Sequence, residues 1–189
     1  MINNLIDFYL KSHPVTLGVL ALLSVYFIMM NWVFLYRYFS LTSWLWRENG
    51  SLESLLLGAS SVSEQSFLNH FIKASSHISK SIFDLGMLAA TKEATKGLAI
   101  LSVFASTSPF IGLFGTVVSI LGTFSHIGQT TGAMSVIAMG VSDALIATAS
   151  GIFVAIFAYT YHQILKRKSF EVISFIQMQS DAILSRKED

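Results

Sequence analysis

Charged residues are scarce in this chain of 189 residues, and their scarcity indicates its class. They make up 12% of the sequence, whereas soluble domains carry about 25%. Cysteine is absent, which excludes disulfides, cysteine metal sites and thiol catalysis. The net charge of +1 gives no basic footprint for nucleic acid, so we expect no such partner. Hydrophobic residues reach 53%, and the sequence therefore predicts an all-α membrane protein whose surface contacts lipid.

Three segments are long enough to cross a bilayer, which takes about 20 helical residues. We place these transmembrane helices at residues 15–36, 97–123 and 136–161. The second and third exceed the hydrocarbon core, so we expect them to tilt or to extend beyond the membrane. The tail, residues 162–189, keeps apolar residues at helical spacing and is expected to continue the third helix.

The distribution of Lys and Arg predicts the orientation. Lys11 is the only one of the 12 that precedes the first span, and residues 124–135 contain none. Because Lys and Arg concentrate in cytoplasmic loops, we expect residues 1–14 and 124–135 outside. Residues 37–96 and the tail are then cytoplasmic.

The segment of residues 37–96 is predicted to be helical. Ser61 and Glu64 have the spacing of a capping box, followed by apolar residues at the spacing of one long helix or a helix pair. Its apolar face is expected to pack on extensions of the spans; the alternative is a helix on the membrane surface. Residues 52–57 suggest a separate short helix that breaks at Gly58.

Asp143 is the only Asp, Glu, Lys or Arg in residues 97–165. An Asp at the centre of a membrane helix costs roughly 3 kcal/mol on insertion scales. Such residues face a bundle interior or a wet cavity and mark ion or proton paths. The alternative is a structural Asp near a helix end. Asp143 and Thr148 lie roughly 140° apart around an ideal helix, so both cannot point at one pore axis.

The second and third spans each carry one face of small or hydroxylated residues. These are Ser102, Pro109, Gly112, Thr116, Ser119 and Thr123 in one span, and Gly140, Ala144, Thr148, Gly151, Ala155, Ala158 and His162 in the other. Two interpretations stay open at this point. Small residues allow close helix packing, whereas hydroxyls beside a membrane acid suit the lining of a pore.

Two motifs in these spans resemble the TolQ/ExbB/MotA proton-channel family. They are Pro109-Phe-Ile-Gly-Leu-Phe-Gly-Thr116-Val and Asp143-Ala-Leu-Ile-Ala-Thr148-Ala-Ser-Gly151. The resemblance implies a pore-forming homo-oligomer, five copies around two copies of a single-span TolR- or ExbD-like partner, in the bacterial inner membrane. It implies that the partner's membrane Asp carries the proton, and that Thr116 and Thr148 match the family threonines.

The chain departs from the family pattern at two positions. The family acid is usually Glu where this chain has Asp143, and Met139 stands where the family usually has Pro. We therefore expect the shorter Asp143 side chain to reach its partner through a shifted backbone or through water.

The resemblance is closer to the TolQ branch than to the ExbB branch. Three spans argue against the MotA type, which has four. About 14 residues precede the first span, whereas ExbB often carries an extra N-terminal extension, and the Gly112-Leu-Phe-Gly form is TolQ-like. This branch implies a Tol-Pal motor that acts on TolA during cell division; the ExbB branch would power TonB and nutrient uptake. A passive membrane scaffold is the alternative from a different class.

No motif indicates an enzyme, a cofactor or a metal site. His70 and His77 lie seven residues apart on a predicted cytoplasmic helix, a pattern that is more often inert than metal-binding. His126 as a proton relay and His162 as a proton exit are weaker alternatives.

Overall fold

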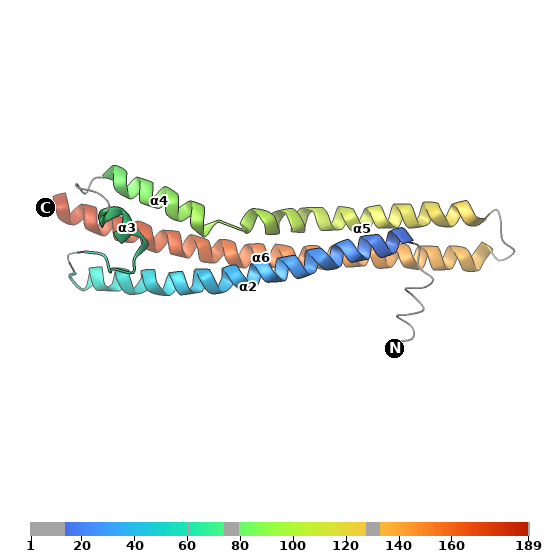
Figure 1. The fold of residues 1–189 in the computed structure, drawn as a ribbon, viewed down its shortest axis with the longest axis horizontal. Coiled ribbons are helices and arrows are strands. Elements are labelled where there is room, and N and C mark those ends of the chain that lie inside the picture. Colours follow the sequence, from blue (N-terminus) through green and yellow to red (C-terminus); the bar gives the residue numbers. More distant parts are fainter. Residues whose placement is uncertain (1–13, 60, 74–79, 128–132, 189) are drawn as a thin grey trace. The chain divides into compact units, whose positions relative to one another are not determined.

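The computed structural model describes residues 14–59, 61–73, 80–127 and 133–188. All regular secondary structure in this part of the chain is helical (Figure 1). The helices are α2 (Pro14–Leu56), α3 (Phe67–Lys73), α4 (Lys80–Ala94), α5 (Leu98–Ile127) and α6 (Ala133–Glu188). Three candidate membrane spans lie within Pro14–Leu56, Lys80–Ser125 and Ile137–Ser185, which confirms the predicted all-α membrane protein.

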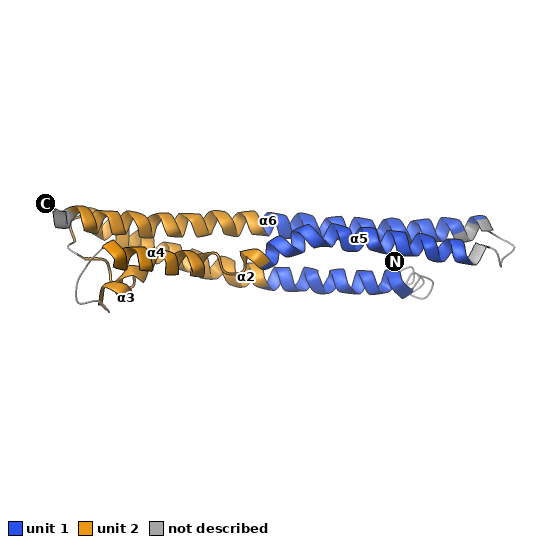
Figure 2. Ribbon diagram, turned by 90° about the horizontal axis from the view of Figure 1, so that it is seen from above, with its two compact units in different colours: residues 1–32, 100–161 blue, residues 33–99, 162–189 orange. Residues whose placement is uncertain are grey.

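The chain divides into two compact units, coloured separately in Figure 2. Unit 1 comprises residues 1–32 and 100–161, and unit 2 comprises residues 33–99 and 162–189. The predicted continuation of the third span is confirmed, because α6 runs without interruption to Glu188. The helix of the first span also continues past residue 36, as far as Leu56.

Two local predictions in unit 2 are wrong. The residues around Leu55 form the end of α2 and no separate helix, although the break at Gly58 is present, with a φ of 107°. Ser61 and Glu64 do not cap a helix, since α3 begins only at Phe67. Glu64 instead forms an ion pair with Lys73 at 2.9 Å. The hydrogen bond and positive charge of Lys73 lower the pKa of this exposed carboxyl.

The N-terminus of α3 is capped by Glu48, which is fully buried on α2. Its Oε1 accepts hydrogen bonds from Phe67 N at 2.8 Å and Trp44 Nε1 at 3.0 Å. Its Oε2 accepts from Ser66 Oγ at 3.0 Å and Gln179 Nε2 at 2.9 Å. Four donors use the acceptor sites of both carboxylate oxygens, and they tie α2, α3 and α6 together.

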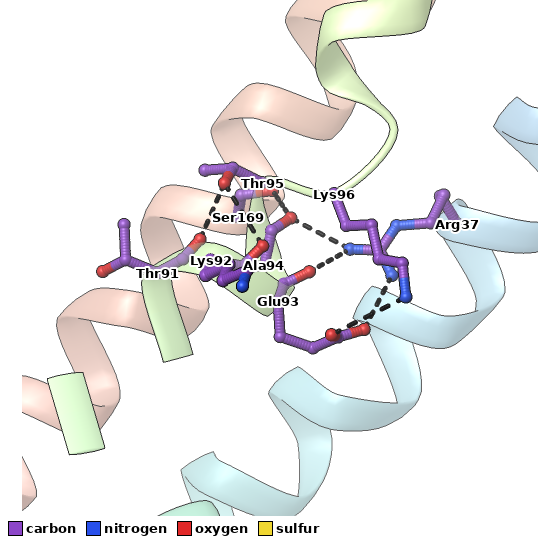
Figure 3. A network of polar contacts seen from close by, with 8 residues as sticks. All are labelled: Arg37, Thr91, Lys92, Glu93, Ala94, Thr95, Lys96 and Ser169. Atoms are coloured by element: carbon purple, nitrogen blue, oxygen red, sulfur yellow. Dashed lines mark hydrogen bonds and ion pairs between the residues drawn. The ribbon is translucent and has the colours of Figure 1, made fainter. Parts of the chain in front are cut away.

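Arg37 caps the C-terminal end of α4 (Figure 3). Its Nη2 donates to Glu93 O at 2.7 Å and to Ala94 O at 3.0 Å, two carbonyls in the last turn of the helix, where backbone acceptors lack full intrahelical partners. Ser169 Oγ of α6 donates to Ala94 O at 2.7 Å. Gly97, at a φ of 87°, turns the chain into α5 in the left-handed conformation that glycine tolerates.

The part of the 37–96 segment that follows Glu64 forms a helix pair, α3 and α4, in line with one of the two alternatives predicted for it. Phe83, Ala90 and Ala94 of α4 are buried, and the Ser169 bond joins this helix to α6. The apolar face of α4 therefore packs on protein inside unit 2, as predicted for the first of the two alternatives.

Candidate functional site

In unit 1, α5 and α6 approach most closely at two glycines, Gly112 and Gly151. A Cβ added to Gly112 would lie 2.8 Å from the carbonyl oxygen of Ala147, and one added to Gly151 would lie 2.6 Å from that of Ser108. Real Cβ atoms do not approach so closely, so only glycine permits this backbone contact. These two predicted site residues therefore pack helices within one chain.

Thr116 and Thr148 meet one turn away from the glycine contact. Thr116 Oγ1 donates to Ala144 O at 3.0 Å and contacts Thr148 Oγ1. Both threonines are half-buried. The structure thus brings together the two hydroxyls that the sequence places on separate spans, at the edge of the seam between α5 and α6.

The seam continues toward the end of α5 through Ser119, Thr123 and Gly140. Ser119 Oγ donates to Gly140 O at 3.2 Å, and Thr123 Oγ1 donates to Ser119 O at 2.9 Å. A Cβ on Gly140 would lie 2.7 Å from the Cβ of Thr123. All three residues therefore belong to the contact between the two helices.

Asp143 lies apart from the threonine pair. The buried side of α6 in unit 1 consists of Ala144, Ala147, Gly151, Val154 and Ala158. With 100° per residue, Asp143 and Thr148 flank this buried stripe on opposite sides, so the expectation that they do not share one axis fits the helix. Asp143 is half-buried, and among the described residues none forms a hydrogen bond or ion pair with its side chain.

The remaining predicted site residues lie outside this tight contact. Ser102 is exposed, and Pro109 and Ala155 are half-buried. A groove of about 510 Å³ runs between α5 and α6 on the flank of Thr148; its lining includes Ser102, Ser106, Ala155, Tyr159 and Thr160. The groove is open and its lining carries hydroxyl groups; that these residues line a pore stays a prediction.

The histidines do not form a metal site in the part of the chain that the structure describes, where no group of three His, Cys, Asp or Glu gathers. His70 is exposed and His162 is half-buried. His77 and the side chain of His126 lie outside the described residues.

Sequence reasoning missed three polar groups in the helix bundle. In unit 2 these are Glu48 with its four donors and Arg37 at the end of α4. In unit 1, Tyr161 OH donates to Asn31 Oδ1 at 3.0 Å and joins α6 to α2. The hydrogen-bond partners of these groups come from distant parts of the sequence, so no local residue spacing could predict the contacts.

The MotA/TolQ/ExbB proton channel family matches residues 59–178. Proteins named putative biopolymer transport protein ExbB-like 1, from two strains of Helicobacter pylori, are 42% and 41% identical and match 99% of this chain and 100% of their own length. Biopolymer transport protein ExbB of Pseudomonas putida is 39% identical over 80 residues, which are 42% of this chain and 24% of that protein. This chain therefore belongs to the MotA/TolQ/ExbB proton channel family and is a multi-pass protein of the inner membrane.

Proposed function

We propose that the chain is the channel subunit of an energy-transducing complex driven by the proton-motive force. The observation that carries this proposal is the meeting of Thr116 and Thr148, which contact each other beside the closest approach of α5 and α6. Their hydroxyls can donate to a carboxylate or accept from its protonated form. We take the recipient to be the membrane Asp of a single-span, TolR- or ExbD-like partner, held inside a ring of copies of this chain.

The free-energy cost of burying a charge explains how such a contact can couple proton transfer to movement of the partner helix. A carboxylate in an apolar pore is unfavourable when it is charged and unpaired. A hydrogen bond from a threonine hydroxyl lowers this cost, so the charged carboxylate binds preferentially beside the threonines. Protonation from outside removes this preference, and release to the inside restores it. One proton crossing 100 mV yields about 2.3 kcal/mol, which is enough to bias such a step. With five copies around two partner helices, as in the family, not every site is filled at once.

We place residues 1–14 and 124–135 on the periplasmic side, with unit 2 and the C-terminus in the cytoplasm. The distribution of Lys and Arg supports this orientation. The proton then enters near the ends of α5 and α6 that the 124–135 segment joins, and leaves into the cytoplasm.

Two biological branches are candidates. The Gly112-Leu-Phe-Gly form favours a Tol-Pal motor that acts through TolA on the outer membrane during division. The names of the relatives, biopolymer transport proteins of the ExbB type, favour a complex that powers TonB-dependent uptake. Loss of the chain sensitises cells to detergent in the first case, and prevents growth on scarce iron chelates in the second.

The test uses cells that carry each variant as their only copy. Thr148→Val and Thr116→Val keep the side-chain volume but remove the hydroxyl, so the energised function is expected to fall while the complex persists. Asp143→Asn should act in the same way, and Asp143→Glu should be the mildest. Thr107→Val is the matched control, because Thr107 is a half-buried residue of α5 whose hydroxyl bonds its own helix at Val103 O.

Complex levels are checked by copurification of the single-span partner. If Thr148→Val, Thr116→Val and Asp143→Asn all support wild-type growth under both selections at normal complex levels, the chain is a passive scaffold and the proposal is wrong.

A further inference from the structure

Thr16, on the first membrane helix, is a buried polar residue with no evident structural role. Its side chain is fully buried, and its Oγ1 has no hydrogen-bond partner in the described structure. Buried hydroxyls are nearly always paired, because desolvating one without a partner is unfavourable. Thr16 therefore calls for a partner that is absent from this arrangement of the side chains.

Contacts between α2 and α6 within unit 1 show which α6 residues lie level with Thr16. The two helices run in the same direction, since Phe27 packs on Phe153 at 5.9 Å and Asn31 bonds Tyr161 further along both. Three turns of helix, about 11 residues, lead back from Phe27 to Thr16. Phe27 packs on both Phe153 and Phe157 of α6, so the same three turns lead back to residues 142–146, a range that includes Asp143.

A second contact gives the same level. A Cβ on Gly115 of α5 would lie 3.1 Å from Val19 and 3.0 Å from Ala147, so Val19 of α2 lies against the crease between α5 and α6. One turn back along each helix leads from Val19 to Thr16 on α2 and from Ala147 to Asp143 on α6.

The direction in which Asp143 faces also agrees. Tyr161 lies 18 residues, or five helical turns, beyond Asp143 and therefore on the same face of α6. Tyr161 uses that face to bond Asn31 of α2. Asp143 thus lies on the α2 side of α6, away from the threonine seam, and at the level of Thr16.

We propose that Thr16 is a positioning residue for Asp143, which it binds directly or through one water molecule. This inference rests on the proposed function, in which Asp143 belongs to the proton path. A hydroxyl both donates and accepts, so it can hold Asp143 in its charged and its neutral form. Residues 14–32 of α2 and 100–127 of α5 contain no Lys or Arg that could pair with Asp143 in place of Thr16.

The experiment compares Thr16→Val, Thr16→Ala and Thr16→Ser in the complex with its single-span partner. Proton flux into cells that contain the complex is expected to fall about tenfold in the first two variants, the scale of one lost charge-assisted hydrogen bond. Thr16→Ser keeps the hydroxyl and should retain the flux. Ser24→Ala is the control, because Ser24 is an exposed α2 residue whose hydroxyl bonds its own helix at Leu20 O.

Infrared spectroscopy of the purified complex tests the contact independently of activity. The C=O stretching band of protonated Asp143 is identified by its absence in Asp143→Asn. Loss of a hydrogen bond to that carbonyl should move the band to higher frequency in Thr16→Val and Thr16→Ala, but not in Thr16→Ser.

An unshifted band with wild-type flux in both hydroxyl-free variants would overturn the inference. Greater thermal stability of Thr16→Val would then identify an unpaired buried hydroxyl that serves packing alone. If those variants are harmless while Asp143→Asn abolishes flux, this inference alone fails. Full flux in Asp143→Asn would defeat the proposed proton path as well.

Discussion

Replacement of Glu48 by Gln tests whether one buried carboxylate holds unit 2 together. The amide retains one acceptor oxygen but presents an NH2 group where the second oxygen accepted Ser66 Oγ and Gln179 Nε2. The Ser66 hydroxyl can rotate and accept instead. Gln179 cannot adapt in the same way without loss, because its own oxygen already accepts from Ser51 Oγ.

The magnitude follows from the four hydrogen bonds. One stranded buried donor costs about 1–3 kcal/mol, and the replacement of charged by neutral bonds costs about 1 kcal/mol for each surviving pair. The sum is about 3–5 kcal/mol. At about 2–4 °C per kcal/mol for a chain of this size, the unfolding midpoint of Glu48→Gln should fall by roughly 10 °C.

The assay is the loss of the monodisperse peak in size-exclusion chromatography after heating the purified protein in detergent. Glu53→Gln is the control, because Glu53 is exposed on the same helix and its substitution should leave the midpoint unchanged. A midpoint for Glu48→Gln within about 2 °C of the control would show that water replaces the lost acceptor, and the reasoning would be refuted.

Two further predictions concern the membrane unit and its orientation. Gly112→Ala and Gly151→Ala should each lower stability by about 1–3 kcal/mol in the same heating assay, because the new methyl overlaps the facing backbone. Gly18→Ala, where nothing lies within 4 Å of the added Cβ, should instead be neutral or slightly stabilising, and an equal loss there would contradict the packing argument. A cysteine at exposed Asn49, in this cysteine-free chain, should resist a membrane-impermeant thiol reagent in intact spheroplasts and react after lysis; labelling before lysis would reverse the proposed topology.

The membrane spans were predictable because their signal is local. A long apolar segment with almost no charge is stable in a bilayer as an α-helix, because the helix satisfies all its backbone hydrogen bonds internally. The small faces of α5 and α6 were equally visible, because glycine and hydroxyl residues recur at helical spacing. Their use was not decided by spacing alone. The structure shows that Gly112 and Gly151 pack against each other's helix, whereas Ala155 and Ser102 border an open groove.

Unit 2 was harder to predict, because its helix ends are stabilised from a distance. The Ser61–Glu64 spacing suggested a local cap, yet α3 begins later and takes its cap from Glu48, 19 residues earlier on α2. The end of α4 depends on Arg37, 56 residues away. A capping box satisfies backbone groups with a neighbouring side chain. Where a buried side chain from another helix caps a helix end, the local sequence pattern no longer predicts where that helix begins.

The packing within one chain bears on where a proton can pass. Between Gly112 and Gly151 the backbones of α5 and α6 touch, so no water file fits through that part of the seam. The hydroxyls of Thr116 and Thr148 remain at its edge, on the same flank of α6 as the groove beside Ala155. We infer that this flank faces the pore and that neighbouring copies and the partner helix complete the path. Asp143, on the opposite flank and toward α2, then contributes to the proton path from the side and does not line this flank of the pore. Because Thr148 and Asp143 lie on different flanks of α6, we predict that Thr148→Val and Asp143→Asn impair transport through different steps. The double variant that combines Thr148→Val with the milder Asp143→Glu should show effects that add in the logarithm of flux, since additivity is expected of sites without shared partners. Strong coupling between the two positions would place them in one contact and refute the separation.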